Sequence, residues 1–67
     1  MELVEIKESL EGSKALLENV VYYLDYINSE DSKTSRVARN MLIVNLFNLV
    51  DTICNTEIDI YNYLKGE

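Results

Sequence analysis

MLIVNLFNLVDTI, residues 41 to 53, is the most apolar stretch of the chain and decides its fold. A transmembrane helix needs about 20 consecutive, mostly apolar residues. Here the longest uninterrupted apolar run is MLIV, and Asn45, Asn48 and Asp51 follow it. We therefore interpret the stretch as part of a water-soluble helix and not as a membrane span.

This stretch lies in the middle of an amphipathic pattern that predicts a helix over residues 35 to 64. At 100° per residue, one side of that helix is apolar and the other carries a polar stripe. The apolar side holds Leu42, Ile43, Leu46, Leu49, Val50, Ile53, Cys54, Ile60, Tyr61 and Leu64, and the polar stripe holds Asn48, Asp51, Asn55, Asp59 and Asn62. The apolar arc covers about half of the circumference, which is wide for a helix with one neighbour.

A second helix is predicted over residues 2 to 28, because apolar residues recur there with heptad spacing. The stripe consists of positions 3, 6, 10, 13, 17, 20, 24 and 27. Gly12 and Ser13 interrupt it, so we expect a bend or a close backbone approach there. The polar segment at residues 29 to 34 forms the turn. Ser32, Thr34 or Ser35 can cap the following helix, and we favour Thr34 or Ser35. The chain is thus predicted to be all-α, a single antiparallel helical hairpin over residues 1 to 67.

The length of 67 residues limits how large a core one copy can build. Small domains are usually reinforced by disulfides, a metal or a second subunit. Cys54 is the single cysteine, so no disulfide can form within the chain, and a zinc site lacks its usual histidine ligands. We therefore expect stabilisation by oligomerisation. Two hairpins joined through their second helices would cover the wide apolar arc as a homodimeric four-helix bundle; burial against a different protein is the alternative. The residues expected in the dimer interface are Leu42, Leu46, Leu49, Val50, Ile53 and Ile60.

Catalytic and metal-binding patterns are scarce in this sequence. Without histidine, the common general base and the Ser-His and Cys-His arrangements are excluded. Cys54 falls on the apolar arc and is expected to be a buried packing residue. Glu5, Glu8 and Glu11 have helical spacing but lie on an outer face without a histidine ligand. We predict a protein that is not an enzyme and has no cofactor and no metal site.

The composition also bears on compartment and partners. A single thiol suits a reducing cytosol, and MELVEIKESLEG has acids where a signal peptide would have cations, so we expect a cytoplasmic protein. The net charge of −6 argues against direct nucleic-acid binding. The cations of KTSRVAR, residues 33 to 39, are expected to form salt bridges across the hairpin.

Tyrosine is the other unusual feature, with five residues in the chain. Tyr22, Tyr26 and Tyr63 are expected to point away from the heptad stripe, and aromatic side chains are enriched in protein interfaces. Acidic side chains share the outer side of the first helix with two of these tyrosines. The predicted site for a partner protein consists of Tyr22, Tyr26, Glu8, Glu11 and Glu18.

The run RVARNMLIVNLFNLVDTICNTEIDIYNYL, residues 36 to 64, resembles a helix of HEPN-type domains, in which an arginine-bearing start leads into an apolar stretch and then an acid. Those families serve in bacterial toxin, RNA-processing and phage-defence systems. Their active members carry an arginine followed a few residues later by histidine. In a chain without histidine, the resemblance implies a helical dimer without ribonuclease activity.

Three hypotheses about function follow. The first is a small dimeric interaction module, a regulator or inhibitor that binds another protein. The second is an acidic nucleic-acid mimic that inhibits a DNA- or RNA-binding protein, suggested by the charge. The third is a catalytically inactive HEPN-like hairpin of a toxin or phage-defence system.

Overall fold

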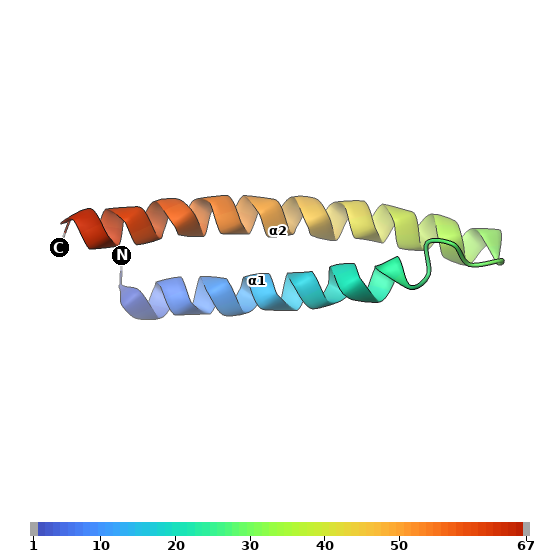
Figure 1. Ribbon diagram of the computed structural model, residues 1–67, viewed down its shortest axis with the longest axis horizontal. Coiled ribbons are helices and arrows are strands. Elements are labelled where there is room, and N and C mark those ends of the chain that lie inside the picture. The colour runs from blue at the N-terminus through green and yellow to red at the C-terminus, as the bar shows by residue number, and fades with distance from the viewer. Residues whose placement is uncertain (1, 67) are drawn as a thin grey trace.

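The computed structural model describes residues 2 to 66 and contains two helices. Helix α1 spans Leu3–Leu24 and α2 spans Ser32–Gly66. They lie side by side in opposite directions, with the turn at one end of the rod and both chain ends at the other (Figure 1). The Cα atoms extend over 53 × 14 × 10 Å. The prediction of an all-α, antiparallel helical hairpin is confirmed.

Helix α1 ends earlier than the predicted residue 28. After Leu24 the backbone tightens, because the amides of Asp25 and Tyr26 donate to carbonyls three residues back, Tyr22 and Tyr23, at 3.3 and 3.0 Å. Such short-range bonds often finish the last turn of a helix. The connection therefore begins at Asp25.

Helix α2 begins at Ser32, before the predicted start at residue 35. Asp31 precedes it, and the Asp31 carboxylate accepts from the amide of Lys33 at 3.4 Å and from the hydroxyl of Thr34 at 2.5 Å. The Thr34 hydrogen bond is the main cause that lowers the pKa of Asp31 from its ordinary value of 3.8. Asp31 thus serves the first free amides of the helix, as an N-cap does. The expectation that Thr34 or Ser35 caps the helix was wrong; the Ser35 hydroxyl instead donates to the carbonyl of Ile27 at 2.5 Å, which ties the turn to α2.

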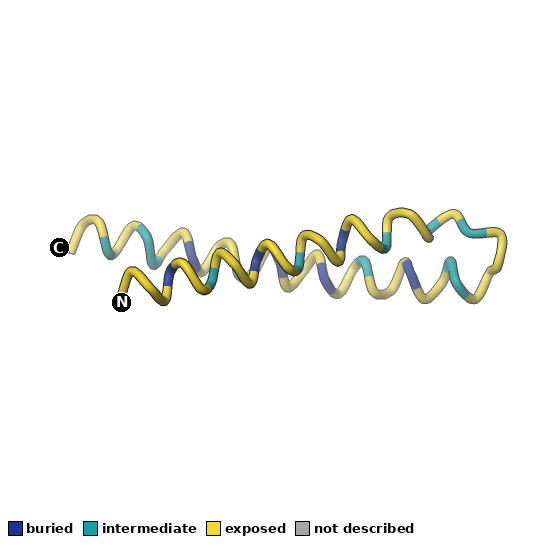
Figure 2. Tube along the Cα trace, turned by 90° about the horizontal axis from the view of Figure 1, so that it is seen from below, coloured by how far each residue is buried: buried dark blue, intermediate teal, exposed yellow. Residues whose placement is uncertain are grey.

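The two helices meet along a narrow line, which we call the hairpin seam. Its buried members recur at heptad spacing and lie where the helices face each other (Figure 2). They are Ile6, Ser13 and Val20 on α1 and Ala38, Asn45, Leu49 and Thr56 on α2. One half of the heptad stripe predicted for the first helix is therefore buried, whereas its other half, at positions 3, 10, 17 and 24, stays about half exposed.

Much of the hairpin seam is polar, and its polar groups are satisfied. The Ser13 and Thr56 hydroxyls donate to the carbonyls four residues back, at 3.0 and 2.8 Å. Asn45 donates to the carbonyl of Met41 at 2.7 Å and accepts from the Asn19 amide at 3.2 Å. Among the described residues, every buried side-chain nitrogen and oxygen has a hydrogen-bond partner, as native interiors require.

Gly12 does not mark a close approach of the helices. A β-carbon added there would meet nothing within 4 Å beyond its own turn of helix. The expectation of a close backbone contact at Gly12 was therefore wrong. Its neighbour Ser13 is the residue that is buried in the hairpin seam. The Ser13 hydroxyl donates to the carbonyl of Ser9 on its own helix, so it needs no hydrogen-bond partner on α2.

Few large apolar side chains are buried within one hairpin. Among the described residues, Ile6, Val20 and Leu49 are the buried apolar ones larger than alanine, and each keeps 4–8% of its surface exposed. Burying one such side chain contributes about 1.5–3 kcal/mol, and ordering each residue of the chain opposes folding. The apolar surface that remains outside the hairpin seam thus becomes the main feature of the molecule.

Candidate interaction surfaces

One side of the hairpin carries a continuous apolar surface built from both helices. On α1, four leucines recur every seven residues, and each keeps between 47% and 51% of its surface exposed. On α2, apolar residues follow the alternating spacing of three and four that is typical of a helix contact from Ile43 to Ile53, and resume after Glu57 at Ile60 and Leu64. We call the set the apolar face: Leu3, Leu10, Leu17 and Leu24 with Ile43, Leu46, Val50, Ile53, Ile60 and Leu64.

Helix geometry explains why these residues share one side. Leu10 follows buried Ile6 by four residues, and Ile53 follows buried Leu49 by four, so each lies one step around its helix from the hairpin seam. Because the two helices run antiparallel, a residue four positions after a buried one lies on the same side of the hairpin in both helices. Leu10, Ile53 and Ile60 accordingly line one shallow hollow of about 180 Å³, together with Thr56 and Glu57.

The predicted dimer-interface residues divide into two groups. Leu46, Val50 and Ile53 are exposed on the apolar face, and Ile60 lies partly exposed beside them. Leu49 is buried in the hairpin seam, and Leu42, seven residues earlier, is half-buried on the same line. Assigning Leu49 to a subunit contact was wrong, because its side chain is already buried within one hairpin. The assignment of Leu42, which is only half-buried, stays a prediction.

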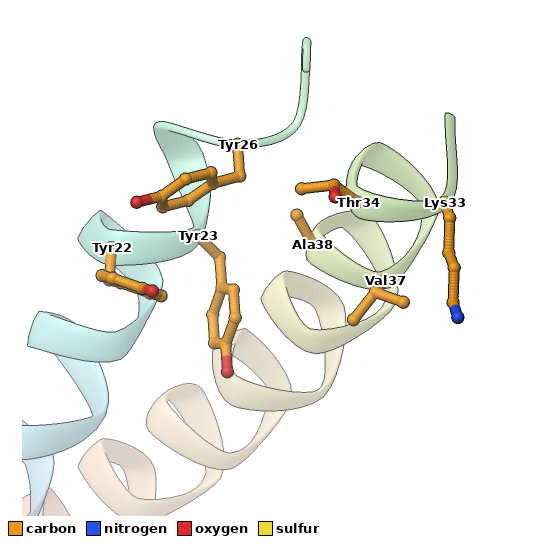
Figure 3. Close-up of a pocket in the computed structure, with 7 residues that line it drawn as sticks. All are labelled: Tyr22, Tyr23, Tyr26, Lys33, Thr34, Val37 and Ala38. Atoms are coloured by element: carbon orange, nitrogen blue, oxygen red, sulfur yellow. The ribbon is translucent and has the colours of Figure 1, made fainter. Parts of the chain in front are cut away.

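A cluster of tyrosines lies at the turn end of the molecule. The Tyr22 ring centroid is 5.3 Å from that of Tyr23, edge to face, and 5.1 Å from that of Tyr26. The rings border a hollow of about 320 Å³ between the end of α1 and the start of α2, which we call the tyrosine pocket (Figure 3). Its lining is Tyr22, Tyr23, Tyr26, Lys33, Thr34, Val37 and Ala38. Aromatic rings arranged this way stabilise one another and present a rigid surface.

The neighbouring Tyr22 side chain is the largest cause that raises the pKa of Tyr26 above its ordinary value of 10.0. The tyrosine pocket offers ring faces and phenol hydroxyls to a partner. Lys33 lines its edge, with its amine directed away from the rings (Figure 3).

The predicted partner site is exposed but does not form one patch. Tyr22 and Tyr26 are in contact, and Glu18 lies one helical turn before Tyr22. Glu8 is fourteen residues before Tyr22, about 21 Å along the helix. The sequence-based prediction missed Tyr23 and Val37, which line the tyrosine pocket. Both residues lie close to the turn that joins the helices, and this shared position is the signal that could have identified them.

Three other side chains lie elsewhere than predicted. Cys54 is exposed, because it follows buried Leu49 by five residues and so lies about 140° around α2 from the hairpin seam. Tyr63 is half-buried in line with Thr56 rather than pointing outward. Arg39, expected to form a salt bridge, donates to the neutral side chains of Ser35 and Asn28 at 3.3 and 3.4 Å.

No cluster of three or more metal-ligating side chains exists within residues 2 to 66. Helix α2 is long and apolar enough to cross a membrane by length and composition, with a mean hydropathy of 1.3 over its most apolar window and 17% of that window buried. The core helix of a soluble protein, which is mostly buried, and a signal sequence can have the same length and composition, so these two properties are weak evidence for a span.

No protein-family model matches the chain, and neither a curated protein nor a solved structure is significantly similar to it. The resemblance of residues 36 to 64 to HEPN-type domains therefore stays a prediction.

Proposed function

We propose that the protein is a non-enzymatic interaction module that works as a homodimer in the cytoplasm and regulates or inhibits a partner protein. The observation that carries this proposal is the apolar face, to which α1 and α2 both contribute and which one hairpin leaves uncovered. A contiguous exposed apolar surface that spans two helices marks a site of association with another protein surface. A second copy covers it as a four-helix bundle.

The total exposed surface supports pairing. The hairpin exposes 5308 Å². A folded monomer of 7.8 kDa is expected to expose about 4,400 Å². The excess is about 900 Å², close to the roughly 800 Å² that each partner buries in a standard stable interface.

The charges of α1 support a soluble dimer rather than insertion of α2 into a bilayer. Helix α1 lies along α2 (Figure 1) and carries charged side chains, all exposed, at Lys7, Glu8, Glu11, Lys14 and Glu18. Insertion of the hairpin would bring these groups into the hydrocarbon, where each charge costs about 2.5 kcal/mol or more. Pairing through the apolar face leaves those on the outer side of α1 in water.

Sedimentation tests the dimer directly. At micromolar concentration we expect a helical species of twice 7.8 kDa, with dissociation on dilution. A species of monomer mass that keeps its full helicity at this concentration would contradict the proposal, because the apolar face would then stay in water although a second copy is available to cover it.

The tyrosine pocket is the proposed contact for the partner, because it remains outside the apolar face. Replacing both Tyr22 and Tyr26 with serine removes the two exposed rings that border it. We expect helicity and dimer mass to stay nearly unchanged and partner binding to weaken by roughly 2 kcal/mol or more, as for interface anchors. The measurement is isothermal titration against the protein that co-purifies with the wild-type chain from its native host.

Tyr61→Ser is the matched control, because Tyr61 is 60% exposed, close to the 57% of Tyr22, but lies near the C-terminal end of α2, far along the rod from the turn. If the double variant unfolds, the tyrosines belong to the core. If it binds as the wild type does, the partner uses another face, and charge reversal at Glu8, Glu11 and Glu18 is the next step. Binding that weakens steeply as salt rises would favour the acidic nucleic-acid mimic instead.

A further inference from the structure

The apolar face of α2 has an internal symmetry about Asn48. Leu46 and Val50 lie two residues to either side of this point, and Ile43 and Ile53 lie five residues to either side. In an antiparallel pair of identical helices, a residue before the two-fold axis faces the partner residue equally far beyond it. An axis level with Asn48 therefore brings Leu46 and Ile43 of one copy onto Val50 and Ile53 of the other, and Ile60 and Leu64 lie beyond this symmetric stretch.

The charges that border this apolar stretch obey the same symmetry. Arg39 lies nine residues before Asn48, and Glu57 lies nine residues after it, both continuing the same line on α2. Glu57 is placed on the apolar face by the hollow it shares with Leu10 and Ile53. Arg39 contacts only neutral groups, Ser35 and Asn28, in the side-chain hydrogen bonds it donates. Arg39 and Glu57 thus lie at equal distances on opposite sides of Asn48.

The leucines of α1 agree with this centre. Leu10 and Leu17, and likewise Leu3 and Leu24, are symmetric about the point between residues 13 and 14. The Asn19–Asn45 hydrogen bond sets which residues of the two helices are level, so this point lies beside residues 50 and 51 of α2. That is about 4 Å from Asn48 along the helix, within one turn. One two-fold axis can therefore serve both helices.

We propose that two hairpins pair through their apolar faces with α2 antiparallel to α2 of the partner subunit, and that Arg39 of each copy faces the partner's Glu57. The proposal rests on the dimer proposed above and adds its arrangement. The two resulting ion pairs lie at the two ends of the apolar contact between the α2 helices. Such charges at the edge of a helix interface select orientation and partner more than they add affinity.

Two other arrangements of the dimer would bring different pairs of charged residues together. Parallel α2 helices would bring Arg39 onto the partner's Arg39 and Glu57 onto the partner's Glu57, which is unfavourable. A two-fold axis along the rod would instead pack α2 on the partner's α1. By the level of the Asn19–Asn45 bond, Glu57 would then face the partner's Lys7, and Arg39 the partner's Asp25.

A charge-exchange experiment separates these arrangements. Arg39→Glu alone and Glu57→Arg alone each place like charges at both ends of the proposed contact, so each is expected to raise the dimer dissociation constant about tenfold or more. An equimolar mixture of the two variants is expected to form a heterodimer, because each end again joins an acid to a cation. The double variant R39E/E57R is expected to return to within about threefold of the wild type. Sedimentation equilibrium and native mass spectrometry measure these species.

Lys33→Glu and Asp51→Lys are the matched controls, since both residues are exposed on other sides of α2 and the substitutions change the net charge equally. Neither control should alter dimerisation, and circular dichroism should report equal helicity throughout. If the wild type is a dimer but neither the mixture nor the double variant restores pairing, the antiparallel α2 contact is overturned while the dimer stands. A monomeric wild type would overturn the dimer itself.

Discussion

Leu49→Asp is expected to unfold the hairpin at every protein concentration. The Leu49 side chain is 8% exposed and packs in the middle of the hairpin seam, where a carboxylate would have neither water nor a cation. Burying an unpaired charge costs several kcal/mol, which is comparable with the whole stability of a small domain. The far-ultraviolet circular dichroism signal of helix should therefore be lost at 25 °C.

Phe47→Asp is the control for this substitution. Phe47 lies two residues away on the same helix and is 73% exposed, so the same charge should leave helicity intact. A folded Leu49→Asp protein would show that α2 is rotated relative to the packing described above.

Ile53→Asp is expected to separate the subunits. Ile53 is 47% exposed in one hairpin, so a carboxylate there reaches water until a second copy covers it. The dimer would then contain two buried charges, one from each copy, and several kcal/mol corresponds to a rise of about 100-fold or more in its dissociation constant. Sedimentation should show monomer at concentrations where the wild type is dimeric, and the urea midpoint should no longer depend on protein concentration.

Asn55→Asp is the matched control, because Asn55 is exposed and lies two residues after Ile53, about 200° around α2 from it. It should dimerise as the wild type does. If Ile53→Asp remained dimeric at the wild-type affinity, the subunits would have to meet through a surface other than the apolar face.

The hairpin was predictable because its signals are local. The spacing of apolar residues in both halves and the polar segment between them specify two helices and one turn without knowledge of any other contact. The positions of the helix ends were less predictable. Asp31, Thr34 and Ser35 are all residue types that favour caps, and the bond of Ser35 to the carbonyl of Ile27 forms only once the chain has turned back on itself.

The division of the apolar residues between the hairpin seam and the apolar face could not be predicted from spacing. Leu49 and Ile53 lie a single helical turn apart and are equally apolar, yet one is buried against α1 and the other is exposed. The choice depends on the rotation of α2 about its axis. That rotation is set by polar side chains such as Asn45, which an analysis of apolar periodicity leaves out.

The bond between Asn19 and Asn45 also limits which other hairpins the chain can form. The buried positions of the hairpin seam repeat every seven residues, so a slip of seven residues would again bring buried positions of α1 and α2 together. After such a slip the amide of Asn45 would lose Asn19 and remain half-satisfied between the helices, at a cost of about 1–3 kcal/mol. A single polar pair thus disfavours the misaligned hairpins that the seven-residue repeat would otherwise allow, so the chain favours one alignment of its helices over a mixture.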